Sequence, residues 1–208
     1  MPRALLSLAF LALLLPLRAS AQTPTLSART LYTFRPHADI LRELAFTPEG
    51  RMLATSSVDR TVKLWRLSDG RLMHTLVHPH GVTSLAFSAH GRVLVTGGYD
   101  GGVSVWSLPG GTLVRRLLGH DGTVWSVDIS RDGSVIASSG EDRTVRLWRA
   151  SDGAPLRTLA GHTRNVWRVA FTPDGRHLAS GSFDYTVKIW QAHSGALSVR
   201  SPMRPRPW

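Results

Sequence analysis

A unit of 41 or 42 residues occurs four times in succession along this sequence, and this repetition constrains the fold more than any other feature. The columns that recur at this interval are His37, His78, His120, His162; Asp59, Asp100, Asp142, Asp184; Trp65, Trp106, Trp148, Trp190; Gly50, Gly91, Gly133, Gly175; and Gly70, Gly111, Gly153, Gly195. A repeating unit of this size cannot bury its hydrophobic face alone, so neighbouring units must stack. The sequence therefore predicts a repeat architecture whose core is shared between units.

Each unit has the pattern of four short β-strands separated by turns. In the third unit we expect strands at 124–129, 134–139, 144–148 and 155–159. Gly133 and Gly153 each follow an aspartate in the intervening turns, where glycine readily takes the positive φ that such turns need. No segment keeps the hydrophobic period of a helix over a useful length. The fold class we predict is all-β, built of four-stranded antiparallel sheets.

A Gly-His pair stands before the first strand in the last two units, and an Asp-x-Thr-Val-x-Leu/Ile-Trp run occupies 59–65, 142–148 and 184–190. In these motifs and in their period the units resemble the WD-repeat family. The resemblance covers about residues 29–200 and implies a β-propeller of four WD-type blades. The residues that follow the repeat tryptophans, where the family has aspartate, are Arg66, Ser107, Arg149 and Gln191. Pro36 and Val77 replace the glycine in the first two units, which weakens turn details rather than the fold assignment.

We divide the chain into a signal peptide at 1–21, a β-propeller domain at 22–200 and a disordered tail at 201–208. The four repeats are expected at about 37–77, 78–119, 120–161 and 162–200. An additional outer strand is expected at 30–34, and a weak closing strand at 196–200.

Because closed propellers have about 4 to 8 blades, the arrangement of these four repeats has three possible interpretations. The chain could form a tight four-blade ring, share a larger ring with a second chain, or be a truncated relative of a longer propeller protein. The last two are favoured, since four blades spaced for a larger ring leave two bare hydrophobic faces.

The first 21 residues have the layout of a secretory signal peptide. Arg3 is followed by an apolar run from Ala4 to Leu17 and then by the small residues 19–21, so cleavage is expected before Gln22. An uncleaved anchor is the alternative, but the run is shorter than the roughly 18–20 apolar residues that span a bilayer. We therefore expect an exported protein, periplasmic or secreted, without a transmembrane segment after cleavage.

Each unit also offers a hydroxyl, a histidine and an aspartate, the residue types of a hydrolase triad. Because these groups recur in all four units, we interpret them as structural; in WD-repeat relatives the matching positions form a buried hydrogen-bond chain. The predicted structural tetrads are His37, Thr55, Asp59, Trp65; His78, Thr96, Asp100, Trp106; His120, Ser138, Asp142, Trp148; and His162, Ser180, Asp184, Trp190. No polar cluster breaks the repeat, so no catalytic residue is expected.

No cofactor or metal site is expected either. His78 and His80 are the only close histidine pair, and there is no Cys or clustered carboxylate to support them as ligands. Without Cys there are also no disulfides and no lipid-modified N-terminal cysteine. No glycine-rich phosphate loop or haem-attachment motif is present.

The resemblance implies a partner-binding upper face, built from the turns before each repeat aspartate and from the starts of the first strands. The partner-binding residues we predict there are Arg42, Tyr99, Trp125, Trp167 and Phe183. Aromatic and arginine side chains are the usual anchors of protein interfaces. The alternative for Trp125 and Trp167 is that they pack between neighbouring blades. We expect a protein or peptide partner of unknown identity and a non-catalytic scaffold function.

The net charge of +11 suggests a second function. Loss of Arg3 and Arg18 with the signal peptide would leave +9. For an exported chain this favours anionic envelope glycan or lipid over nucleic acid, which we do not expect as a partner. The alternative is that dispersed arginines simply keep the surface soluble, since no basic run exceeds the pair Arg115-Arg116.

Overall fold

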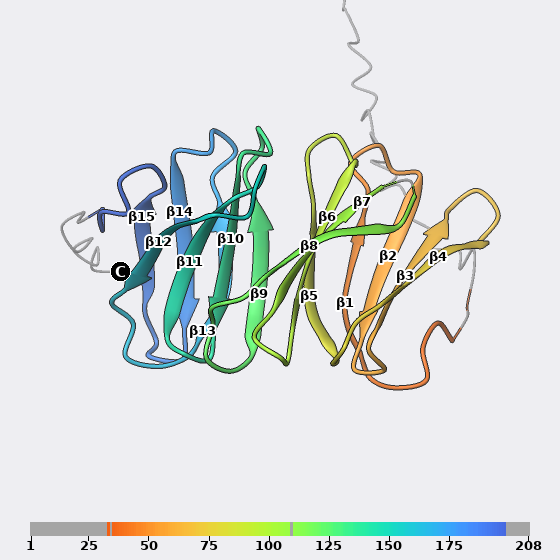
Figure 1. Cartoon of the computed structure of the whole chain (residues 1–208), viewed down its shortest axis with the longest axis horizontal. Coiled ribbons are helices and arrows are strands. Elements are labelled where there is room, and N and C mark those ends of the chain that lie inside the picture. Colours follow the sequence, from red (N-terminus) through yellow and green to blue (C-terminus); the bar gives the residue numbers. More distant parts are fainter. Residues whose placement is uncertain (1–32, 34, 109, 199–208) are drawn as a thin grey trace, which may run out of the picture. The chain divides into compact units, whose positions relative to one another are not determined.

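The computed structural model describes residue 33, residues 35–108 and residues 110–198. The chain divides into two units, and the second, Phe34–Trp208, contains all of the described residues except Thr33. Fifteen strands, all in the second unit, make up the regular structure of the described residues (Figure 1). No helix in this part of the chain is long and apolar enough to cross a membrane. The predicted signal peptide, the C-terminal tail and nearly all of the expected strand at 30–34 lie outside the described residues.

The strands form four antiparallel sheets, which we call blades 1 to 4, and each blade is ordered in space as in the chain. Blade 1 consists of β1 (Leu41–Phe46), β2 (Met52–Ser57), β3 (Thr61–Arg66) and β4 (Leu72–Val77). Blade 2 consists of β5 (Val82–Phe87), β6 (Val93–Gly98), β7 (Val103–Ser107) and β8 (Thr112–Leu117). Blade 3 consists of β9 (Val124–Ile129), β10 (Val135–Gly140), β11 (Thr144–Arg149) and β12 (Pro155–Ala160). Blade 4 consists of β13 (Val166–Phe171), β14 (His177–Ser182) and β15 (Val187–Gln191).

These sheets confirm the predicted all-β fold of antiparallel blades, and the strands of blade 3 lie within one residue of the expected ranges. Blade 4 differs in having three strands in its described part. Beside β15, Leu197 forms an isolated bridge with Trp190, and Ser198 N–H donates to the Ile189 carbonyl at 2.7 Å.

The turn between the second and third strands of each blade contains a residue with positive φ. Arg60, Arg143 and Tyr185 have φ values of 71°, 65° and 66°, and Gly101 takes the same place in blade 2 with 71°. The left-handed region is costly for residues other than glycine. In blades 1, 3 and 4 this turn places the repeat aspartate beside the segment that precedes the first strand. There the carboxylate accepts a hydrogen bond from a backbone N–H, that of Ala38, Asp121 or Thr163.

Three hydrophobic clusters lie between consecutive blades rather than inside any one of them. In the first cluster, one side comes from blade 1 and consists of Ala54, Val62, Leu64 and Leu76. The other side comes from blade 2 and includes Val82, Leu85, Leu94 and Trp106. The equivalent residues make the other two clusters. Each blade thus has a forward face, which packs on the next blade, and a backward face, which packs on the preceding one.

We call the first strand of each blade, β1, β5, β9 or β13, its innermost strand. Side-chain hydrogen bonds at equivalent positions join the innermost strands of neighbouring blades. Glu43 Oε2 accepts from the Leu85 N–H at 2.8 Å, and Ser84 Oγ accepts from the Val127 N–H at 3.1 Å. Ser126 Oγ accepts from the Val169 N–H at 3.3 Å. The fourth residue in this column is Arg168, whose Nη1 donates to Glu43 Oε1 at 2.7 Å and so links blade 4 to blade 1.

The two ends of the array keep their hydrophobic faces uncovered. On the backward face of blade 1, Leu44 and Phe46 are 56% and 57% exposed, whereas Leu85, the equivalent of Leu44, is 4% exposed. On the forward face of blade 4, Val187 is 71% exposed, whereas its equivalent Val145 is fully buried. The two end faces therefore do not close on each other as a tight four-blade ring would require. In Figure 1 the blades follow one another in chain order, with blade 1 at the right and blade 4 at the left.

Candidate functional site

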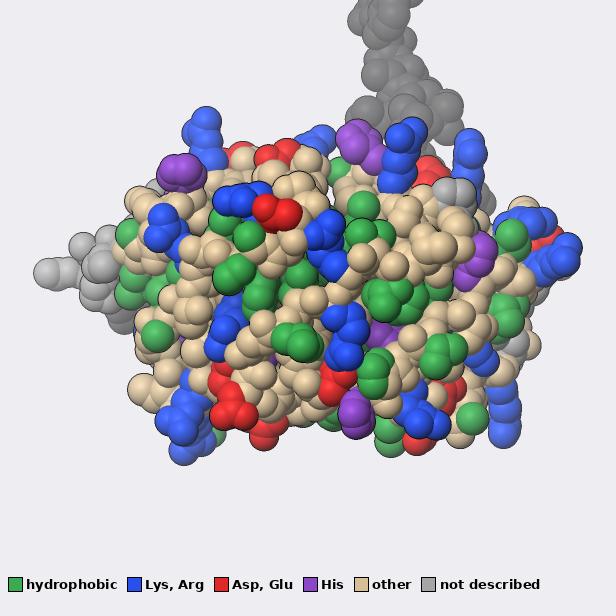
Figure 2. All heavy atoms as spheres, viewed as in Figure 1, with side chains coloured by type: hydrophobic (Ala, Val, Ile, Leu, Met, Phe, Trp, Pro, Cys, Tyr) green, Lys and Arg blue, Asp and Glu red, His purple; other side chains and the backbone are tan. Residues whose placement is uncertain are grey.

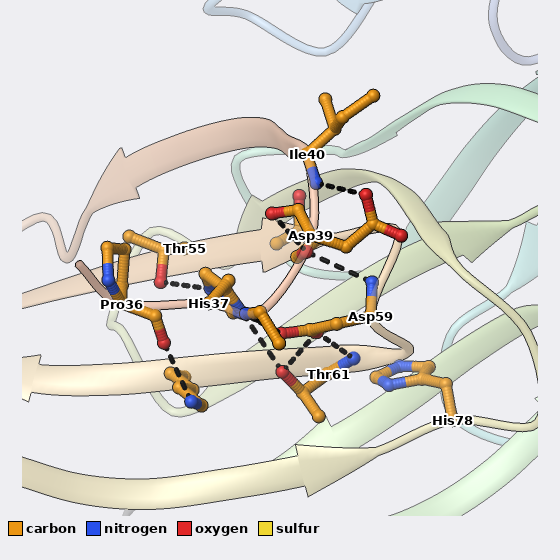
Figure 3. A network of polar contacts seen from close by, with 12 residues as sticks. Pro36, His37, Asp39, Ile40, Thr55, Asp59, Thr61 and His78 are labelled. Atoms are coloured by element: carbon orange, nitrogen blue, oxygen red, sulfur yellow. Dashed lines mark hydrogen bonds and ion pairs between the residues drawn. The ribbon is translucent and has the colours of Figure 1, made fainter.

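Three of the four blades contain a continuous polar network that runs from the repeat tryptophan to the repeat aspartate. In blade 3, Trp148 Nε1 and His120 Nε2 each lie 2.8 Å from Ser138 Oγ, and His120 Nδ1 lies 2.9 Å from Asp142 Oδ2. In blade 4 the corresponding distances, Trp190–Ser180, His162–Ser180 and His162–Asp184, are all 2.8 Å. In blade 1, His37 lies 2.8 Å from Thr55 and 3.0 Å from Asp59 (Figure 3).

One assignment of protons satisfies every atom in these networks. The indole N–H donates to the hydroxyl oxygen, the hydroxyl donates to Nε2 of a neutral histidine, and Nδ1–H donates to the carboxylate. A serine protease orders its hydroxyl, histidine and aspartate in the same way. Here, however, Ser138 is fully buried and its oxygen is engaged by Trp148. A hydroxyl without access to substrate cannot act as a nucleophile, so the geometry supports a structural role.

The carboxylates of these networks are held in their ionised form. Burial alone would raise the pKa of Asp59, but hydrogen bonds from Thr61, the Ala38 N–H and His37 outweigh it and lower the pKa to about 2. In blade 4, hydrogen bonds from Thr186, Thr163 and His162 likewise keep the pKa of Asp184 well below its usual range. Each aspartate thus anchors its turn as a charged acceptor at neutral pH.

Blade 2 departs from this arrangement, although all four residue types are present. Trp106 Nε1 lies 3.2 Å from Thr96 Oγ1, and His78 Nε2 lies 2.9 Å from the same oxygen. The other ring nitrogen of His78, Nδ1, lies 3.2 Å from the Leu76 carbonyl, and Asp100 is paired with Arg116 instead. Burial of His78 lowers its pKa to about 4, so the ring is neutral at physiological pH.

Two coupled substitutions in the second repeat account for this difference. Thr61, Thr144 and Thr186 each donate a hydroxyl hydrogen bond to the aspartate of their own blade, but the second repeat has Gly102 at that position. A side chain at Gly102 would collide with the guanidinium of Arg116. The missing threonine therefore leaves room for Arg116 to reach Asp100. Both residues, Gly102 and Arg116, are visible in the sequence as departures from the other repeats. The repeat period alone does not show that their side chains meet.

All five predicted partner-binding residues lie in one continuous row, which we call the aromatic stripe. Arg42 lies over the ring of Tyr99 at 6.0 Å, and Tyr99 meets Trp125 edge-on with 6.1 Å between ring centroids. Trp125 stacks on Trp167 at 4.9 Å, and Trp167 meets Phe183 edge-on at 5.3 Å. The stripe draws residues from all four blades. Four aromatic and cationic contacts thus connect residues that are far apart in the chain.

Repeating positions of the fold place these side chains together. Tyr99 and Phe183 occupy the turn before the repeat aspartate, whereas Arg42, Trp125 and Trp167 are the second residues of innermost strands. Trp167 and Phe183 are 45% and 49% exposed. Trp125 is partly exposed through its ring, but its Nε1 is buried without an acceptor among the described residues. The two tryptophans therefore both pack on each other across blades and present aromatic surface to solvent.

The charge is spread over the surface shown in Figure 2 rather than gathered into one patch. Lys and Arg side chains lie along both edges of this view, interspersed with Asp and Glu, and hydrophobic side chains lie between them. Among the described residues there is no group of three or more His, Cys, Asp or Glu that could hold a metal ion.

Comparison with models of protein families shows which family the chain belongs to. The model of the family described as WD domain, G-beta repeat matches residues 28–66, 70–107, 111–149 and 153–191. The chain belongs to this WD-repeat family. Each match ends at the residue that follows a repeat tryptophan, so the family model contains the tryptophan columns identified above.

Curated relatives of this WD-repeat chain include the ribosome biogenesis protein BOP1 homologs of Drosophila virilis, Drosophila erecta and Drosophila melanogaster. Each is 37% identical over 43 residues, which is 21% of this chain and 6% of the relative. The similarity thus spans about one repeat, and the chain matches only a small part of these longer proteins.

These relatives overturn the expected export to the periplasm or the cell exterior. They are named for ribosome biogenesis, a process that takes place inside cells. The apolar run at the N-terminus was therefore an insufficient basis for a location, because hydrophobicity and small residues alone do not determine where a chain is delivered. The envelope glycan or lipid partner depended on that location and is withdrawn with it.

Proposed function

We propose that this WD-repeat chain is a non-catalytic scaffold that holds a protein or peptide partner on its aromatic stripe. The observation that carries the proposal is the continuity of the stripe across all four blades. The repeat tryptophans Trp106, Trp148 and Trp190 are at most 5% exposed, whereas Trp167 and Phe183 remain about half exposed. Aromatic surface is thus kept available along the stripe, whereas the repeat tryptophans are buried.

The chemistry of the stripe suits a peptide segment. Aromatic rings provide large contact areas at a low cost in conformational entropy, and aromatic and arginine residues dominate binding hot spots. Stacking of Trp125 on Trp167 fixes both rings before a partner arrives, which reduces the ordering cost of binding. The buried hydroxyls of the polar networks support a scaffold rather than a hydrolase, because no substrate could reach them.

Selection from a displayed random peptide library tests the proposal. We expect peptides enriched on the folded chain to lose at least about tenfold in affinity when Trp167→Ala or Phe183→Ala is introduced, since hot-spot truncations cost about 1.4 kcal/mol or more. Leu113→Ala is the matched control, because Leu113 is 48% exposed but lies on the outer strand β8, away from the stripe.

Two results would contradict the proposal. One is enrichment no greater than on a heat-denatured sample of the chain. The other is a set of peptides whose affinity is unchanged by Trp167→Ala and Phe183→Ala, which would place recognition elsewhere. Melting temperatures of all variants are compared first, so that loss of binding is not confused with loss of folding.

The relatives suggest a setting for such a partner. Because the matched segment occurs in proteins named for ribosome biogenesis, we propose a ribosome assembly factor as a second, narrower candidate partner. Purified precursor ribosomal particles would then bind the wild-type chain and bind Trp167→Ala less. Binding that is equal for both chains would exclude this candidate while leaving the peptide test unaffected.

A further inference from the structure

The uncovered faces at the two ends of the array are the two halves of the interface that the chain already forms three times. By the repeat period, Leu41, Leu44 and Phe46 of blade 1 correspond to Val124, Val127 and Ile129, which pack on blade 2. Val187 and Ile189 of blade 4 correspond to Val145 and Leu147, which pack on blade 4 from blade 3. Each end face therefore carries apolar side chains at the positions through which the internal interfaces pack.

Glycine positions show the same relation at the scale of single atoms. A Cβ added to Gly97 of blade 2 would lie 3.2 Å from Val124 Cβ of blade 3. The equivalent glycine of blade 4 is Gly181, and a Cβ there would meet nothing within 4 Å. The residue of blade 1 that corresponds to Val124 is Leu41, which is 39% exposed. Gly181 thus lacks the neighbour that Gly97 has in Val124, and Leu41 lacks the neighbour that Val124 has in Gly97.

From these relations we propose that two copies of this chain dock head to tail, the forward face of blade 4 of each copy on the backward face of blade 1 of the other. Two such junctions related by a two-fold axis close a ring of eight blades, which lies within the range of about 4 to 8 found in propellers. The inference does not depend on the proposed binding of a partner to the aromatic stripe.

Aromatic contacts would continue across the junction. The charged residues of the innermost column, Glu43 in blade 1 and Arg168 in blade 4, already pair with each other within one chain at 2.7 Å, so the junction depends on its apolar faces. Tyr99 of blade 2 contacts Trp125 of blade 3, and the equivalent pair across the junction is Phe183 of one copy and Arg42 of the other. The second copy would therefore extend the aromatic stripe around the ring.

Cysteine cross-linking tests the geometry directly, because the natural chain has no Cys. We combine Leu41→Cys with Gly181→Cys in the full-length chain and oxidise it. Disulfides need a Cβ separation of about 3.5–4.5 Å, close to that of the equivalent internal pair. We expect one covalent species of twice the chain mass on a non-reducing gel, which returns to the single-chain mass on reduction. Leu41→Cys and Gly181→Cys alone are the controls, and neither should cross-link.

Mixing the two single variants provides the second arm. The head-to-tail arrangement predicts a cross-linked pair that contains one chain of each kind. Three outcomes would overturn the proposal. An intramolecular disulfide would indicate a four-blade ring, a ladder of higher masses would indicate an open filament, and a lack of cross-linking in the double variant, checked to melt cooperatively, would mean that the two faces do not meet.

Discussion

At the scale of single residues, the six tryptophans in the part of the chain that the structure describes divide according to what their N–H groups and ring faces contact. Trp148 and Trp190 donate to buried hydroxyls and are 3% and 4% exposed. Trp167 stacks on Trp125 and remains 45% exposed. The first pair holds a blade together, and the second pair belongs to the surface that we propose for binding.

Removal of the central hydroxyl of a polar network should cost stability. Ser138→Ala leaves the Trp148 N–H without its acceptor and His120 Nε2 without its donor, and both lie in a buried region. We expect a loss of about 2–4 kcal/mol in the free energy of unfolding, measured in urea. Ser151→Ala, at an exposed turn position, should change it by less than about 0.5 kcal/mol. Equal effects of the two substitutions would contradict a structural role for the network.

The buried His78 should make stability depend on mildly acidic pH. Burial lowers its pKa to about 4 in the folded chain. Between pH 6.5 and pH 4, His78 is therefore protonated in the unfolded chain but neutral in the folded chain. The free energy of unfolding should therefore fall as the pH drops from 6.5 to 4, by at most about 1.4 kcal/mol per pH unit for this group. His78→Gln should show a smaller decrease between pH 7 and pH 5. An identical decrease in both chains would mean that His78 titrates normally in the folded state.

At the scale of elements, blade 2 shows that two changes within one repeat can replace a recurring contact. Arg116→Thr should destabilise the blade, because Asp100 loses its ion pair with Arg116 while its side chain is only 15% exposed. Adding Gly102→Thr should then restore stability, since the space vacated by Arg116 admits a threonine whose hydroxyl can donate to Asp100. In the double-mutant cycle we expect a favourable coupling of about 1 kcal/mol from urea unfolding. Additive effects would contradict this account.

The strands could be predicted from the sequence because turn residues and tryptophans recur at a fixed interval. The strands of blade 3, for example, were placed to within one residue. The pairing of Asp100 with Arg116 could not be predicted, because it depends on the space that Gly102 leaves between two strands. The five residues of the stripe were identified by their columns, but their continuity depends on how consecutive blades pack, which no single repeat determines.

At the scale of the whole molecule, repetition explains why each end of the array has a hydrophobic face that no blade covers. Every blade has a forward and a backward hydrophobic face, so any array that does not close leaves one of each uncovered. Whether the chain closes on itself depends on the angle between blades, which the repeat period does not contain. Exposed side chains such as Phe46 and Val187 show that closure within one chain does not occur. Large exposed apolar faces normally mark sites of association.

The solution mass of the full-length chain, measured by light scattering after size exclusion, tests this account most directly. We predict a single species of twice the chain's 22.8 kDa. Phe46→Glu and Val187→Glu, one on each end face, should shift it to the single-chain mass, because each buries a charge in the junction. Leu118→Glu, at a residue 67% exposed outside these faces, should leave it unchanged. A wild-type chain that is a compact monomer, or a dimer that neither end-face substitution disrupts, would contradict the claim that the two ends of the array are complementary.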